Sequence, residues 1–198
     1  MVVLLGFAAE PRLTQAAAPG TALRTAVFAG GCFWCEEAAF DEIPGVTNVV
    51  SGYTGGRLVN PSYEQVSGEN TGHAESVQVT YDPAKISYAR LLEIFWRNID
   101  PFDAGGQFCD RGDSYRSEIF VATPEERALA EQSKAALEKR FRRALATKIT
   151  AATRFYPAED YHQDYHRVNP LRYRYYRAGC GRDARLDKIW GAEARPKS

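Results

Sequence analysis

Cysteine and histidine are scarce in this chain, and their scarcity disfavours two classes of protein. The 198 residues contain four cysteines and three histidines. Four cysteines are too few for a disulfide scaffold in a chain of this length. A structural zinc site usually takes two closely spaced ligand pairs, and the sequence has one Cys-x-x-Cys pair, Cys32 and Cys35. We therefore expect no metal and no cofactor, and redox chemistry is favoured for the thiols.

Net charge and long hydrophobic runs are also missing. The 25 basic and 25 acidic residues cancel, so we expect neither nucleic-acid nor membrane binding. No apolar run is long enough to span a membrane. Val2–Ala9 is apolar and Gln15–Ala18 resembles a small-residue cleavage site, but a positively charged n-region is absent. We expect residues 1–23 to be a disordered tail or remnant signal segment and residues 24–198 to form a single domain, with a cytoplasmic or periplasmic location left open.

The apolar pattern predicts alternating strands and helices. Strands are predicted at Arg24–Ala29, Val46–Tyr53, Glu75–Tyr81 and Glu118–Val121. Helices are predicted at Phe33–Asp41, after Ser87 to about Ile99, and after Thr123 to about Leu145. The β-α-β-β-α-β order indicates an α+β, two-layer sandwich with a mixed, mainly antiparallel sheet and a ferredoxin-like core. An extra helix and a coil-rich C-terminal tail are expected to follow this core.

The segment Gly31-Cys32-Phe33-Trp34-Cys35 lies between a predicted strand and a predicted helix. A helix N-terminus carries about half a positive charge and unpaired N–H groups, so it favours a thiolate at Cys32. A thiolate beside two aromatic side chains suits attack on a small apolar substrate with a polar tip. The alternative is a buried structural cysteine, as most free cysteines are.

Three further residues are candidates for proton donation. Glu75 shares the apolar face of its strand with Val77 and Val79, where desolvation raises a carboxyl pKa and makes it a proton donor. Tyr63 and Tyr115 lie on two long polar loops, 57–72 and 100–115. A tyrosine hydroxyl can donate a hydrogen bond to an oxygen atom without carrying charge. A carboxylate in water and tyrosines that only pack are the alternatives.

Five short motifs, in this order along the chain, resemble those of the peptide methionine sulfoxide reductase A (MsrA) family. The resemblance covers residues 26 to 191. The motifs are Gly31-Cys32-Phe33-Trp34, Gly52-Tyr53-Thr54-Gly55-Gly56, Asn60-Pro61-Ser62-Tyr63, Thr71-Gly72-His73-Ala74-Glu75 and Tyr115-Arg116-Ser117.

The resemblance implies a role for each candidate residue in a catalytic domain. Cys32 is the attacking cysteine and Glu75 is the acid. The substrate methyl group is held by Phe33 and Trp34. The sulfoxide site is completed by Tyr63, Asp110 and Tyr115. The implied reaction reduces the S epimer of methionine sulfoxide, free or peptide-bound, and leaves Cys32 as a sulfenic acid.

A second thiol must then convert the sulfenic acid to a disulfide, which an outside dithiol reduces. By resemblance this dithiol is thioredoxin, and we expect a monomer. Many family members have glycine at the position of Cys35 and asparagine at that of Cys109, so three cysteines compete. We rank Cys180 first because its flanking glycines let a tail fold over the site, then Cys35, then Cys109.

Other classes of protein fit less well. A thioredoxin-like thiol–disulfide oxidoreductase would account for the Cys32-x-x-Cys35 pair but leaves Glu75 unexplained. A peptide-binding module with an aromatic tail would not need a reactive thiol, so an ordinary Cys32 pKa would favour it. A zinc protein would be recognised by its metal content.

Overall fold

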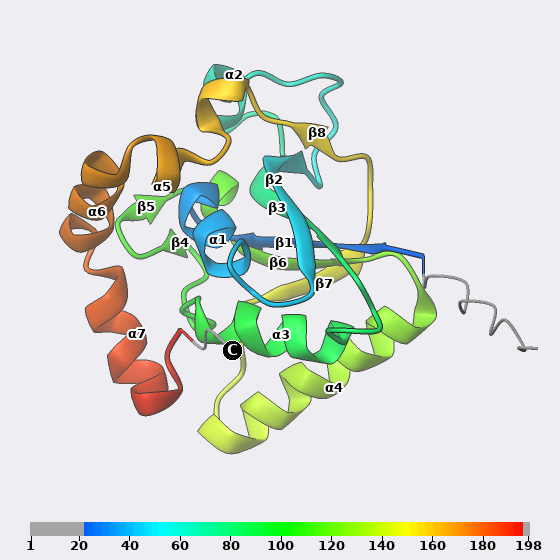
Figure 1. Ribbon diagram of the computed structural model, residues 1–198. Helices are drawn as coiled ribbons and strands as arrows, with labels where there is room; N and C mark the ends of the chain where they lie inside the picture. The colour runs from blue at the N-terminus through cyan, green and yellow to red at the C-terminus, as the bar shows by residue number, and fades with distance from the viewer. Residues whose placement is uncertain (1–21, 196–198) are drawn as a thin grey trace, which may run out of the picture.

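The computed structural model describes residues 22–195, which form an α+β fold around one mixed sheet (Figure 1). Its six strands run in the spatial order β7-β6-β1-β3-β2-β8. Neighbours pair antiparallel except β6 and β7, which are parallel. The strands are β1 (Arg24–Gly30), β2 (Val46–Thr54), β3 (Ala74–Tyr81), β6 (Ser117–Val121), β7 (Lys148–Ala151) and β8 (Tyr156–Pro157).

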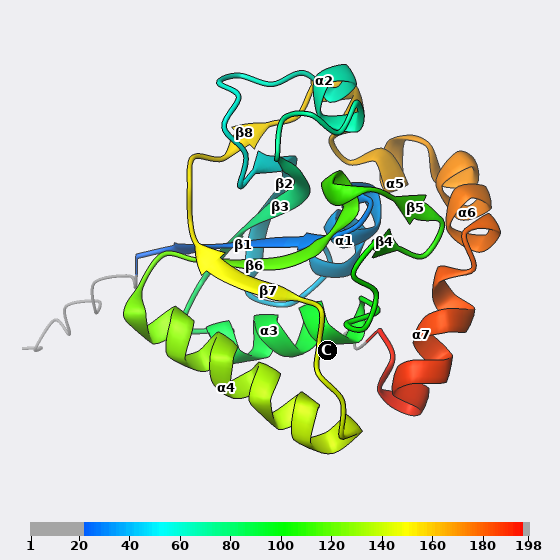
Figure 2. The same cartoon turned by 180° about the vertical axis from the view of Figure 1, so that it is seen from behind.

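Three helices, α1 (Phe33–Phe40), α3 (Tyr88–Arg97) and α4 (Pro124–Phe141), pack against the sheet, with α3 and α4 side by side (Figures 1 and 2). The Ser87 and Thr123 hydroxyls accept backbone N–H bonds at the starts of α3 and α4, as expected of N-caps. The core beneath the sheet is aromatic. Phe28 of β1 stacks on Phe40 of α1 and Phe95 of α3 at ring-centroid distances of 5.4 and 5.1 Å.

The predicted loops contain short elements that fix the positions of site residues. Loop 57–72 includes α2 (Tyr63–Ser67), which starts with a capping box between Ser62 and Gln65. Loop 100–115 includes β4 (Gly106–Gln107), β5 (Asp110–Arg111) and the 3-10 turn η1 (Asp113–Tyr115). Gly106 is required where β4 meets β5, because a Cβ there would collide with the backbone oxygen of Asp110.

The C-terminal region differs from the expected coil. It contains α5 (Tyr165–Val168), α6 (Pro170–Gly179), α7 (Arg182–Trp190) and a final 3-10 turn, η3 (Gly191–Glu193). The prediction of a coil-rich tail was therefore wrong. These helices bury only isolated residues such as Tyr173 and Leu186, while Tyr175 is 87% exposed, so the sequence lacks a continuous apolar stripe. Helix α4 also ends four residues before the predicted Leu145, at the left-handed Arg142.

Two expectations concern the chain as a whole. The tail assigned to residues 1–23 lies almost entirely outside the described residues. Among the helices of residues 22–195, none is long and apolar enough to cross a membrane.

Candidate active site

Cys32 lies at the turn between β1 and α1, as the N-cap residue of α1. The preceding Gly31 has a φ of 86°, and a Cβ on it would lie 2.5 Å from the Cβ of Gln107, so this turn requires glycine. The Cys32 side chain is buried, with 5% of the residue exposed. The turn therefore holds Cys32 in the interior, close to the start of the neighbouring strand β3.

The opening of β3 places Glu75 beside this turn. The carboxylate oxygen Oε2 of Glu75 accepts a hydrogen bond of 3.0 Å from the backbone N–H of Phe33, the first residue of α1. Burial raises the pKa of Glu75 to about 8, helped by the nearby charges of Asp110 and Cys35, while the Phe33 N–H opposes the rise. Glu75 is therefore mostly a neutral carboxylic acid near pH 7, a state that can donate a proton.

A small cavity of about 60 Å³ joins these residues to others distant in the sequence. The cavity is lined by every residue that we predicted to attack the substrate, to donate the proton, to hold the methyl group or to complete the sulfoxide site. Tyr176 of α6 also lines it and was not predicted. The lining residues are Cys32, Phe33, Trp34, Tyr63, Glu75, Asp110, Tyr115 and Tyr176.

Trp34 forms an aromatic wall with residues of the C-terminal helices. Its indole stacks on Tyr165 at 3.7 Å and meets Tyr176 edge-on at 5.7 Å. Its Nε1–H donates to Nδ1 of His162 over 3.1 Å. Burial lowers the pKa of His162, which agrees with a neutral ring that accepts this bond. The tyrosine-rich segment of the sequence was the available signal for Tyr165 and Tyr176, but nothing in it singled out these two.

The two predicted tyrosines remain hydrogen-bond donors. Burial, with the nearby Glu75, raises the pKa of both Tyr63 and Tyr115, so both hydroxyls keep their protons. Glu159 holds Tyr63 in place by accepting its backbone N–H and the hydroxyl of Tyr53, each at 2.9 Å. The cavity therefore combines neutral proton donors with aromatic surface.

Asp110 also points into the cavity and accepts a hydrogen bond from the Tyr176 hydroxyl. Burial raises the pKa of Asp110, although the Tyr176 hydroxyl and Arg182 oppose the rise. Strand β5, which carries Asp110, is thus tied to α6 at the cavity wall.

The four cysteines fall into two pairs. Cys32 and Cys35 are free and buried, whereas Cys109 and Cys180 form a disulfide with a Cα–Cα distance of 4.8 Å. Burial raises the pKa of the Cys32 thiol well above its usual range, so the helix terminus does not by itself make Cys32 a thiolate as we expected. A hydrogen bond from Cys32 lowers the pKa of Cys35 to about 6 against the effect of burial.

The surroundings of the second pair bear on metal binding. Within residues 22–195, one group of three potential metal ligands lies close together, and it consists of Cys109, Asp110 and Cys180. Because the disulfide joins its two sulfurs, neither is available as a thiolate ligand.

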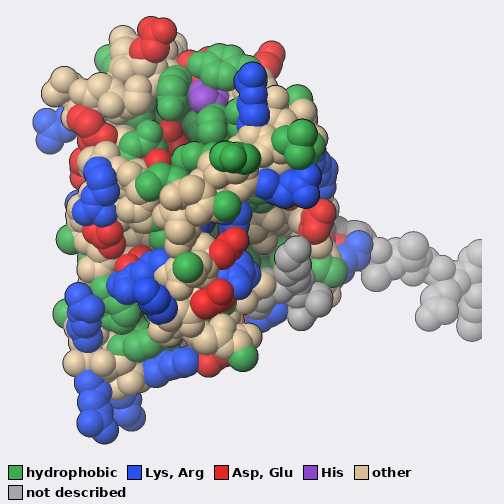
Figure 3. Space-filling view, turned by 90° about the vertical axis from the view of Figure 1, so that its left-hand side faces the viewer, with side chains coloured by type: hydrophobic (Ala, Val, Ile, Leu, Met, Phe, Trp, Pro, Cys, Tyr) green, Lys and Arg blue, Asp and Glu red, His purple; other side chains and the backbone are tan. Residues whose placement is uncertain are grey.

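The face built by α5, α6 and α7 mixes acidic and basic side chains (Figure 3).

A buried cysteine and a neutral carboxylic acid in one cavity with aromatic walls are the groups of a thiol-dependent oxidoreductase. A sequence model of the family described as peptide methionine sulfoxide reductase matches residues 24–194. The chain belongs to the peptide methionine sulfoxide reductase family, as its motifs indicated.

Relatives and a solved structure agree with this assignment. The chain is 53% identical over 189 residues to peptide methionine sulfoxide reductase MsrA 2 of Caulobacter vibrioides, covering 93% of this chain and 96% of that protein. It is 54% identical over 168 residues to the MsrA of Bacillus licheniformis, covering 84% and 93%. The fold is similar to methionine sulfoxide reductase A of Corynebacterium diphtheriae, with a TM-score of 0.68, 32% identity, and 80% and 79% of the two chains covered.

Proposed function

We propose that this protein reduces methionine S-sulfoxide, free or within a peptide, to methionine. The observation that carries the proposal is the pairing of Cys32 with Glu75, a carboxyl whose pKa is raised to about 8, in one cavity. A sulfoxide sulfur accepts a thiolate only when its oxygen is protonated or firmly hydrogen-bonded. Glu75 is protonated near pH 7 and supplies that proton.

Each remaining cavity residue has one role in the proposed reaction. Phe33 and Trp34 enclose the methyl group, and Trp34 is held in position by Tyr165 and His162. Tyr63 and Tyr115 donate hydrogen bonds to the sulfoxide oxygen, where negative charge develops during attack.

Asp110 completes the site by accepting a hydrogen bond from the hydroxyl of Tyr176, which also lines the cavity.

The chemical step transfers the oxygen atom from substrate to enzyme. The Cys32 sulfur attacks the sulfoxide sulfur, and Glu75 protonates the oxygen. The products are methionine and Cys32 sulfenic acid, so the substrate sulfur is reduced and the Cys32 sulfur is oxidised.

For the resolving thiol we propose Cys35, which replaces Cys180 at the head of our ranking. Cys180 is bonded to Cys109 and has no thiol in this state, whereas Cys35 is free and one helical turn from Cys32. Attack of Cys35 on the sulfenic sulfur forms the Cys32–Cys35 disulfide and releases water. The Cys35 backbone N–H already donates to the Cys32 carbonyl at 3.0 Å, which places the two residues close together.

Thioredoxin or a similar dithiol is the proposed reductant of the oxidised enzyme. The Cys32–Cys35 pair is buried, whereas Cys109 is exposed. Because thiol–disulfide exchange requires access to a sulfur, the Cys109–Cys180 bond is the disulfide that an outside dithiol reaches first. Cys109 and Cys180 would then pass electrons inward to the buried pair.

The finer fold assignment is also a proposal. The four strands β1, β2, β3 and β6 lie in the order β6-β1-β3-β2, with α1 and α3 in the connections. This order supports a ferredoxin-like core, and β7, β8 and the C-terminal helices extend it.

Mass spectrometry of the disulfides trapped after one turnover tests this scheme. The reduced enzyme is mixed with one equivalent of a methyl sulfoxide and quenched by alkylation. We expect methionine together with a Cys32–Cys35 disulfide. A Cys32–Cys180 disulfide as the first product would restore Cys180 as the resolving residue.

A further inference from the structure

The imidazole ring of His162 contacts three of the side chains that line the substrate cavity, although it does not line the cavity itself. His162 ends the 3-10 turn η2 (Asp160–His162) and is buried. Its ring centroid lies 4.9 Å from that of Phe33, 5.7 Å from that of Trp34 and 4.5 Å from that of Tyr63. Phe33 and Trp34 belong to α1 and Tyr63 to α2, so one buried ring spaces cavity walls that come from two separate helices.

The hydrogen bond from Trp34 fixes the orientation of this ring as well as its position. Because the Trp34 Nε1–H donates to Nδ1 of His162 over 3.1 Å, the hydrogen of the neutral imidazole lies on Nε2. Nε2 is buried and has no hydrogen-bond partner within residues 22–195. In this part of the chain, the bond to Trp34 is therefore the one hydrogen bond of the His162 side chain.

The next residue, Gln163, attaches His162 to the sheet. Its amide group accepts a hydrogen bond from the backbone N–H of Ser51 at 2.9 Å and donates to the carbonyls of Ser51 and Ala158 at 3.0 and 2.9 Å. The side chain thus pairs with both backbone groups of Ser51 in β2, as a neighbouring strand would. Three hydrogen bonds with a completely buried strand residue give Gln163, and with it His162, a fixed distance from the sheet.

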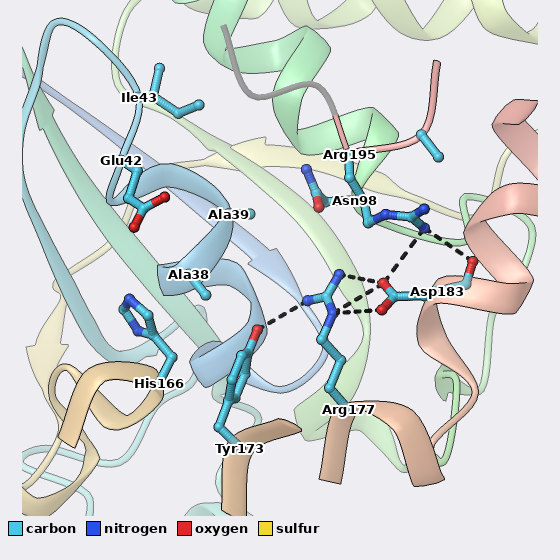
Figure 4. Close-up of a pocket in the computed structure, with 11 residues that line it drawn as sticks. Ala38, Ala39, Glu42, Ile43, Asn98, His166, Tyr173, Arg177, Asp183 and Arg195 are labelled. Atoms are coloured by element: carbon cyan, nitrogen blue, oxygen red, sulfur yellow. Dashed lines mark hydrogen bonds and ion pairs between the residues drawn. The ribbon is translucent and has the colours of Figure 1, made fainter. Parts of the chain in front are cut away.

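The residues that follow Gln163 are attached to α1. The backbone N–H of Asp164 donates to Glu37 Oε1 at 3.1 Å, and His166 Nε2 lies 3.1 Å from Asp41 Oδ2. Figure 4 shows His166 beside α1, where it lines a cavity of about 480 Å³. Segment 163–166 therefore joins β2 to α1, and His162 is held at the junction.

Other residues of the substrate cavity are held by contacts that do not involve His162. Asp110 accepts its hydrogen bond from Tyr176, which joins β5 to α6. A displacement of His162 would therefore move the three aromatic side chains that it contacts relative to Asp110 and Tyr176. Such a shift changes the width of a cavity of only about 60 Å³. In a closely packed site of this size, one additional methylene group must displace a wall.

We propose that His162 and Gln163 are positioning residues that set the width of the methyl contact and thereby determine specificity for methyl over larger alkyl sulfoxides. The inference rests on the proposed function and adds the residues that decide which alkyl group the site accepts. His162 acts through the three aromatic side chains that it contacts. Gln163 acts by holding His162 at a fixed distance from β2.

The test is a competition between the S epimers of methionine sulfoxide and ethionine sulfoxide, which differ by one methylene group. Fully reduced enzyme is mixed with an excess of both substrates and no reductant, and methionine and ethionine are quantified by mass spectrometry. The product ratio reports the ratio of the two kcat/KM values. Because both substrates compete for the same active molecules, this ratio does not depend on how much of a variant is folded.

Wild-type enzyme should form at least about ten times more methionine than ethionine, the usual discrimination for one methylene group in an apolar pocket. Gln163→Met, which keeps the side-chain length but loses all three hydrogen bonds, should lower this ratio by about threefold or more. His162→Leu should do the same. His162→Asn should lower the ratio less, because asparagine has the shape of leucine and carries an oxygen that can replace Nδ1 as the acceptor for Trp34.

Asp164→Asn supplies the matched control next to Gln163. The Asp164 side chain is exposed and lies 3.9 Å from Arg167, and asparagine tolerates the left-handed φ of 51° at this position. This variant should keep the wild-type product ratio. If His162→Leu yields no active protein, the comparison of Gln163→Met with Asp164→Asn carries the test.

The outcomes separate this inference from the proposed function. Absence of both products with the wild type would contradict the proposed function itself. A wild-type product ratio retained by Gln163→Met and His162→Leu would overturn the inference while leaving the reductase activity intact. Equal ratios in His162→Asn and His162→Leu would overturn the role of the bond to Trp34. A loss of total product without a change of ratio would also count against specificity, because it indicates a merely structural effect.

Discussion

Replacing Glu75 with glutamine removes one proton and changes little else. The amide oxygen can still accept the 3.0 Å hydrogen bond from the Phe33 N–H, and the side-chain volume is nearly the same. With a pKa of about 8, Glu75 is protonated in about nine of ten molecules at pH 7. An ordinary glutamic acid would be protonated in only about one of 500. Burial therefore keeps Glu75 protonated at pH 7, and glutamine has no acidic proton to donate in its place.

We expect Glu75→Gln to slow single-turnover methionine formation by about 10²–10⁴-fold, the usual contribution of a general acid. The apparent substrate dissociation constant should change much less. The wild-type rate should fall as pH rises through about 8, because the raised pKa means that Glu75 loses its proton there. Glu75→Gln should lack this alkaline limb.

Rapid-quench measurements of methionine at several pH values give both quantities. Glu131→Gln, an exposed change on α4, serves as the control. A loss below about threefold at the pH optimum would refute the reasoning, since the hydrogen bonds of Tyr63 and Tyr115 would then suffice to activate the oxygen.

Further predictions concern the methyl contact and the order in which the cysteines react. Trp34→Ala should raise the apparent substrate dissociation constant in an equilibrium binding titration. Loss of one methyl contact is worth about 1 kcal/mol, and loss of the whole ring costs about 3 kcal/mol. Intact binding with lowered thermal stability would make Trp34 a core residue only. Cys35→Ser should release one methionine per enzyme and accumulate a Cys32 sulfenic acid that a dimedone-type probe detects. Immediate disulfide formation in this variant would show that another cysteine is the resolving residue. Cys180→Ser should still form the Cys32–Cys35 disulfide but lose thioredoxin-dependent turnover, and full turnover would exclude the relay through Cys109.

The sequence located the cavity residues that lie on regular elements or in distinctive turns. Strand alternation placed Glu75 on the apolar face, and the glycine-flanked turn placed Cys32 at the start of a helix, so simple periodicity was informative. Tyr63 and Tyr115 were candidates from their polar loops, but packing was an equal alternative until the family resemblance was considered. Asp110 depended on the resemblance alone, because loop conformation does not follow from periodicity.

The missed residues belong to the C-terminal helices. Tyr165 and Tyr176 lie in a segment with no apolar stripe, and each is positioned by an aromatic contact with Trp34, more than a hundred positions earlier. The Cys109–Cys180 pairing likewise depends on the proximity of β5 to the end of α6. Contacts between residues that are far apart in the sequence leave no local sequence pattern from which they could be predicted. Burial also reversed the expected effect of the helix terminus on Cys32, because desolvation of a sulfur that is 5% exposed outweighs the helix dipole.

The most direct test of the account is stoichiometric methionine formation from the separated sulfoxide epimers, with fully reduced enzyme and no added reductant. Wild-type protein should convert the S epimer in a burst of at least one methionine per enzyme and leave the R epimer untouched, and Cys32→Ser should convert neither. Methionine formation by Cys32→Ser, or equal conversion of both epimers by the wild type, would contradict the assignment of Cys32 as the nucleophile of an S-specific methionine sulfoxide reductase.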